Sequence, residues 1–151
     1  MLKIAIIAFV LSMVFVAAAL ADSPVQINHC EWQFENPNED DYNIRAGVSF
    51  TNVSTMAATA VKFTFVYRDA FGNTVNTLGT GSGTITGVFS PGVLIQPRRA
   101  LNGVMQINSE RYPNSPVWEL YNFSGKDVTD VSCSVNSVRF EDGSVWTQPL
   151  P

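Results

Sequence analysis

The chain has 151 residues, of which 46% are hydrophobic and 15% are charged, and its formal net charge is −4. A disordered chain contains fewer apolar and more charged residues, so this composition predicts a folded protein with room for one core. The few basic side chains of this acidic chain argue against a nucleic-acid or anionic-membrane surface, so we expect neither as a partner.

Residues 1–21 have the three parts of a secretory signal peptide. Lys3 supplies the positive charge, an apolar run fills 4–16, and Ala19-Leu20-Ala21 fits a cleavage site. An uncleaved membrane anchor is the alternative, but the apolar run is short for crossing a bilayer. We predict cleavage after Ala21, which leaves one domain of residues 22–151. That domain is expected to be secreted or periplasmic, without stable membrane insertion.

Apolar and polar residues alternate along much of the mature chain. The ranges 44–50, 61–67 and 101–107 each place their apolar residues on one face, which is typical of a half-buried strand. No stretch of 22–151 shows a helical stripe, and residues with high strand propensity are abundant. The sequence therefore predicts an all-β fold, an immunoglobulin-like antiparallel β-sandwich of about seven to nine strands.

Breaks in this alternation predict local features of the sheets. The apolar parity changes near Asn28-His29 and near Asn136-Ser137, and one extra residue in a strand, a β-bulge, causes such a change. Asp142-Gly143 between two short strand-like runs predicts a hairpin. The range 70–97 has no charged residue and many glycines, which predicts a wide hairpin or a glycine-weakened edge strand.

One segment resembles a known family. Val61-Lys62-Phe63-Thr64-Phe65-Val66-Tyr67-Arg68-Asp69, followed by Gly72, resembles the signature strand and turn of FxLYD-type domains, which are small immunoglobulin-like sandwiches of exported bacterial proteins. The resemblance covers residues 61–75. It implies the fold and no catalytic residue, because the family is not known for a defined active site.

The two cysteines, Cys30 and Cys133, predict a disulfide bond. An export signal sends the chain to an oxidising compartment, where two thiols in one small domain usually pair. Both cysteines share a strand face with apolar residues, so both should point into the core. The bond would connect the first strand to a late strand. Two separate buried thiols are the alternative.

Residues that could carry catalysis or hold a metal ion are sparse. His29 is the one histidine, and without a nucleophile elbow or zinc-ligand spacing we interpret it as structural. Carboxylates gather around Pro37, at Glu35 and in the range 39–41. Such oxygens could bind calcium, but the EF-hand spacing is missing and a solvated acidic turn is our interpretation. We expect no catalytic residue, metal or cofactor, and so no enzyme.

Aromatic residues gather in the range 112–123. Tyr112, Trp118 and Tyr121 would suit a sugar ring or a partner protein if their faces were exposed, whereas core packing is the alternative. The sequence thus predicts an exported, non-enzymatic binding or structural module of the cell envelope or extracellular space, with protein as its partner. A carbohydrate-binding domain that uses these aromatic residues is the alternative function.

Overall fold

A computed structural model describes residues 22–35, 42–75, 81–123 and 128–149, and these ranges contain strands and no helix. The strands are β1 (Val25–Glu35), β2 (Tyr42–Asn52), β3 (Ala58–Arg68), β4 (Gly81–Phe89), β5 (Leu94–Ile95), β6 (Val117–Phe123), β7 (Asp130–Phe140) and β8 (Val145–Thr147). The all-β prediction is confirmed, and the number of strands lies in the expected range.

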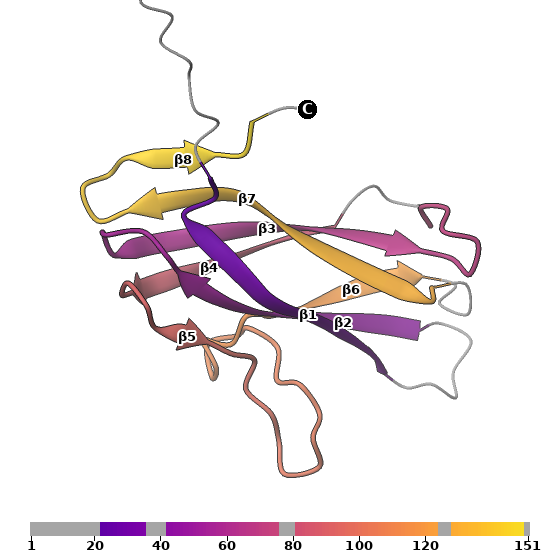
Figure 1. Cartoon of the computed structure of the whole chain (residues 1–151). Helices are drawn as coiled ribbons and strands as arrows, with labels where there is room; N and C mark the ends of the chain where they lie inside the picture. Colours follow the sequence, from indigo (N-terminus) through magenta and orange to yellow (C-terminus); the bar gives the residue numbers. More distant parts are fainter. Residues whose placement is uncertain (1–21, 36–41, 76–80, 124–127, 150–151) are drawn as a thin grey trace, which may run out of the picture.

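The strands form two antiparallel sheets that face each other (Figure 1). In sheet A, β2 pairs with β1 on one side and with both β5 and β6 on the other. In sheet B the order is β4-β3-β7-β8. The core lies between the sheets, since apolar side chains from both inner faces pack together there.

The alternating segments supply this core. In β3 the side chains of Val61, Phe63 and Phe65 are 0% exposed, because a strand directs every second residue to the same face. Phe63 packs against Phe50 of β2, with 5.2 Å between ring centroids. Full burial of one such side chain contributes about 1.5–3 kcal/mol. The prediction of strands at 44–50 and 61–67 is confirmed.

Both predicted bulges and the predicted hairpin are present. The register of β1 with β2 shifts between Ile27 and His29. The register of β7 with β3 shifts between Val135 and Ser137, which leaves Asn136 as the extra residue. After β7 the chain turns through Asp142-Gly143 and returns as β8. The uncharged segment contains β4, an edge strand of sheet B, as expected.

The prediction of a strand at 101–107 is wrong, because this range forms a turn. The amide of Gly103 donates to the carbonyl of Ala100 at 2.9 Å, and the amide of Ala100 donates to the carbonyl of Val104 at 2.9 Å. Gly103 has φ of 80°, a left-handed conformation that glycine adopts without strain. This tight turn places Leu101 fully in solvent. The alternation here spans the two arms of a turn, so it does not describe one strand.

A disulfide bond joins Cys30 and Cys133, the two cysteines predicted to pair. Cys30 lies in β1 at an edge of sheet A, and Cys133 lies in β7, which is an inner strand of sheet B. Their Cα atoms are 5.8 Å apart, within the usual range for a disulfide. The bond therefore holds the two sheets together.

Among the predictions that fall outside the described residues are the signal peptide in 1–21 and most of the acidic cluster, in 39–41. Within the residues that the structure describes, no helix has the length and apolar character to cross a membrane.

Candidate functional site

The most unusual feature of the fold is the connection between β5 and β6, residues 96–116, which we call the docked loop. It contains isolated bridges but no strand, and Figure 1 shows it extending well beyond the strands of sheet A. Connections longer than about 15 residues without secondary structure are usually either functional or disordered. Contacts with sheet A hold this loop in place.

Met105 anchors the docked loop on the outer face of sheet A. Its side chain is 1% exposed and lies over Gly47 of β2. A Cβ atom at Gly47 would lie 2.6 Å from the Met105 sulfur and 3.1 Å from Pro97. Glycine in the middle of a strand normally costs stability, so its presence here fits a close approach. The missing side chain provides the space that Met105 fills.

Polar contacts hold the backbone of the same residue. The Met105 amide donates to Oε1 of Gln33 in β1 at 3.4 Å, and Nη1 of Arg45 in β2 donates to the Met105 carbonyl at 2.8 Å. The Arg45 Nε also lies 3.8 Å from a carboxylate oxygen of Glu119 in β6. Three strands of sheet A therefore contribute to one binding position for the loop.

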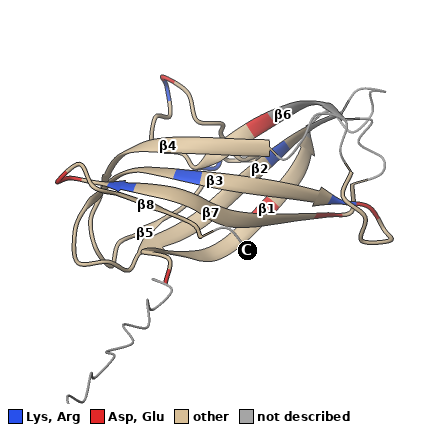
Figure 2. Cartoon of the chain, turned by 90° about the horizontal axis from the view of Figure 1, so that it is seen from above, with Lys and Arg blue, Asp and Glu red and all other residues tan. Residues whose placement is uncertain are grey.

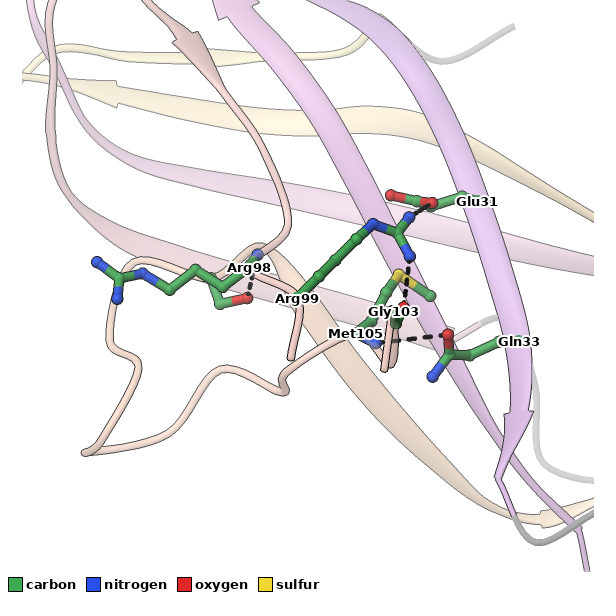
Figure 3. Close-up of polar contacts among 7 residues, drawn as sticks. Glu31, Gln33, Arg98, Arg99, Gly103 and Met105 are labelled. Atoms are coloured by element: carbon green, nitrogen blue, oxygen red, sulfur yellow. Dashed lines mark hydrogen bonds and ion pairs between the residues drawn. The ribbon is translucent and has the colours of Figure 1, made fainter. Parts of the chain in front are cut away.

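Arg99 fixes the outer part of the docked loop. Its guanidinium forms an ion pair with Glu31 of β1 and donates to the Gly103 carbonyl at 2.9 Å (Figure 3). It thereby ties the turn at 100–104 to sheet A. Leu101 projects from this turn and has a relative exposure of 110%. Because these contacts hold the turn, Leu101 is presented to solvent in an ordered position, which makes it a candidate contact residue.

The base of the docked loop is closed by Ser115. Its buried hydroxyl accepts a hydrogen bond from the Arg98 amide at 3.2 Å and donates to the Gln106 carbonyl at 2.5 Å. The Val48 amide of β2 donates to the Pro116 carbonyl at 3.0 Å. Hydrogen bonds at both ends and in the middle therefore connect the loop to the rest of the domain.

The surface of the described part of the chain includes two hollows that bear on the site. One, of about 460 Å³, lies between the start of β1 and the end of β8, and Ile27, Val135 and Trp146 are among its apolar lining residues. The other, of about 290 Å³, lies at the base of the docked loop and is lined in part by Leu94 and Arg98. The second hollow extends the candidate surface toward β5.

Shifted pKa values occur in β3 and in two turns. Burial raises the pKa of the Tyr67 phenol in β3 above its usual range. The pKa of Asp69 is lowered, mainly by the side-chain hydrogen bond from Asn73, and that of Asp142 by the hydroxyl of Ser144. Both carboxylates close turns. Among the described residues, no three His, Cys, Asp or Glu side chains converge on one point.

The structure separates the aromatic residues considered as ligand contacts. Trp118 points from β6 toward sheet B, and its ring lies 5.8 Å from Phe63 and 5.6 Å from Phe65 between centroids. Tyr112 is a half-buried residue of the docked loop, with the Arg111 guanidinium 5.6 Å from its ring centroid. The Tyr121 side chain lies outside the described residues. Trp118 therefore packs in the sandwich rather than beside Tyr112.

Sequence reasoning missed the contacts that define the site. It assigned Leu101 to the buried face of a strand, although Asn102-Gly103 is a strong turn signal. It also gave no role to Gly47, whose position within a strand pattern is a signal for close approach of another chain segment.

Comparisons with known proteins add no function. No protein-family model matches the chain, and no curated protein matches it. Among solved structures, a hypothetical protein from Peptoclostridium difficile 630 aligns with a TM-score of 0.36 and 15% identity, covering 84% of this chain and 87% of that chain. Northeast Structural Genomics Consortium target SoR45 aligns with a TM-score of 0.32 and 13% identity, covering 83% and 80%. TM-scores this low assign neither a family nor an activity.

Proposed function

We propose that the chain is an exported, non-enzymatic immunoglobulin-like module that binds a partner protein through the docked loop, with Leu101 as the apolar anchor. The observation that carries this proposal is the full exposure of Leu101 on a loop that is itself fixed to sheet A. An ordered loop loses little conformational entropy on binding, which favours affinity.

Polar side chains of the docked loop fit a protein interface. Asn102, next to Leu101, is exposed, and so are Glu110 and Arg111 further along the loop. Interfaces combine a buried apolar centre with a polar rim. Burial of one leucine in a partner's pocket would contribute about 1.5–3 kcal/mol. The Cys30–Cys133 disulfide suits an oxidising compartment and supports export.

Site-specific photocrosslinking in the exporting cell tests this function. A photoreactive residue at position 101 should give a defined protein adduct, which excess purified wild-type protein abolishes and excess Leu101→Asp protein does not. A photoreactive residue in place of Phe71 is the matched control, because Phe71 is also an exposed apolar residue on a turn, at 90%. Absence of an adduct at 101, or an identical adduct at 71, would contradict the proposal.

The carbohydrate-binding alternative makes a different prediction. If it holds, purified protein binds a soluble glycan, Tyr112→Ala abolishes that binding, and Leu101→Asp leaves it unchanged. This result would replace the protein-binding proposal.

A further inference from the structure

The edge strand β4 offers a second candidate surface, and it is the end of this strand, at Gly87–Phe89, that lies near Asn114 of the docked loop. Sheet B ends at β4 on one side and at β8 on the other. β8 covers three residues, whereas β4 covers nine, Gly81–Phe89. In sheet A the edge strand β1 is crosslinked to β7. Of these three edge strands, β4 is therefore longer than β8 and, unlike β1, carries no disulfide bond.

The β4 edge lacks the features that usually prevent pairing with another strand. Natural edge strands carry charged residues, proline or a very short length, but β4 has no charge and no proline, and the chain has no charged residue throughout 70–97. Figure 2 shows β4 without acidic or basic residues, next to a β3 that carries Lys62 and Arg68. A register shift opposite Ala58–Ala60 disturbs only the end of β4.

The backbone of β4 has hydrogen-bonding groups to offer. In an antiparallel strand every second residue directs its N–H and C=O away from its partner. Within the described part of the chain, the backbone hydrogen bonds of Ser82–Thr86 connect to β3 alone. The Trp118 ring packs against Gly83 from inside, where a Cβ atom would overlap it. This contact holds the strand in place.

We propose that two copies of this chain associate through antiparallel pairing of their β4 strands along Ser82–Thr86. The two four-stranded B sheets would then form one continuous sheet of eight strands. A two-fold axis beside Thr84 places Thr84 opposite its own copy and Ser82 opposite Thr86, and hydroxyl side chains are compatible cross-strand partners.

The exposed hydroxyl side chains of β4 are self-complementary in this register, which favours a second copy as the occupant. The chain has a net charge of −4, so two copies repel each other across faces that carry carboxylates. The β4 edge brings no like charges together. Its exposed side chains Ser82, Thr84 and Thr86 alternate with the buried Gly83 and Ile85, so self-pairing leaves the hydroxyl side chains on the outer face of the extended sheet.

Sedimentation and light scattering of the mature protein test the pairing. We expect wild-type protein to reach the mass of a dimer, and Thr84→Asp and Thr84→Lys each to weaken association by about tenfold or more because like charges then meet. An equimolar mixture of the two variants should restore the dimer. Thr147→Asp, on the opposite edge strand β8, is the matched control and should leave the dimer intact.

Several results would overturn this proposal. One is wild-type protein that stays monomeric at about 1 mM. Others are equal effects of Thr84→Asp and Thr147→Asp, or failure of the mixture to associate while both variants give wild-type circular dichroism.

Backbone amides in 82–86 should also exchange more slowly as protein concentration rises. Leu101→Asp should not alter the dimer, so this test and the crosslinking test fail separately.

Discussion

Loss of the Cys30–Cys133 bond should remove a large share of the stability of this domain. The cysteines are 103 positions apart, and in the chain-entropy model closure of a loop of about 100 residues stabilises the folded state by about 4.7 kcal/mol. Whole domains of this size are stable by roughly 5–15 kcal/mol. We therefore expect the Cys30→Ala/Cys133→Ala variant to lose about 4–5 kcal/mol of unfolding free energy.

Urea unfolding followed by tryptophan fluorescence measures this loss. Reduction of the wild-type protein should reproduce the effect of the double variant, and reductant should not change the double variant itself. The slope of free energy against urea should also rise, because an uncrosslinked chain exposes more surface when it unfolds. A loss below about 1 kcal/mol would refute the entropic argument. Two alkylated thiols found without reductant would refute the bond.

Three further predictions test individual contacts. Met105→Ala should lower the unfolding free energy by about 2–5 kcal/mol, whereas Leu101→Ala should change it by less than about 0.5 kcal/mol; equal effects would contradict the docking of the loop. Gly83→Ala should lower the unfolding free energy by about 1–3 kcal/mol, because the new methyl group would overlap the Trp118 ring. Thermal stability like that of the wild type would contradict this packing. Asp142 accepts hydrogen bonds from the hydroxyl and the amide of the residue two positions later, and these bonds lower the pKa of Asp142. The contribution of Asp142 to stability should be present above the ordinary pKa of about 3.9 and lost as pH falls through the lower pKa of the folded state. The unfolding free energies of the wild type and Asp142→Asn should therefore converge in acid. A difference that stays constant with pH would contradict the pKa shift.

Local patterns were sufficient to predict the strands that build the core. The alternation in 61–67 describes the faces of β3 correctly, because one side of that strand packs in the core and the other side is more exposed. The parity change at Asn28-His29 located a bulge to the residue. Both signals act over a few neighbouring positions, so they can be recognised in the sequence alone.

The candidate site depends on contacts between residues that are distant in the sequence. Arg99 meets Glu31 across 68 positions, and Met105 meets Gln33 across 72. No local pattern encodes such a pair. In 101–107 the local signals conflicted, since alternation favoured a strand while Asn102-Gly103 favoured a turn. The anchoring contacts around Arg99 and Met105 stabilise the turn.

Two glycines connect the core to both proposed surfaces. Gly47 in sheet A leaves space on the outer face for Met105, and Gly83 in sheet B leaves space on the inner face for Trp118. The first contact holds the loop that carries Leu101, and the second packs the Trp118 ring against the inner face of β4. Each glycine thus exchanges some intrinsic strand stability for a close contact that orders a surface. An ordered surface loses less conformational entropy on binding than a mobile one. For this reason we propose that binding occurs at the docked loop and at the β4 edge.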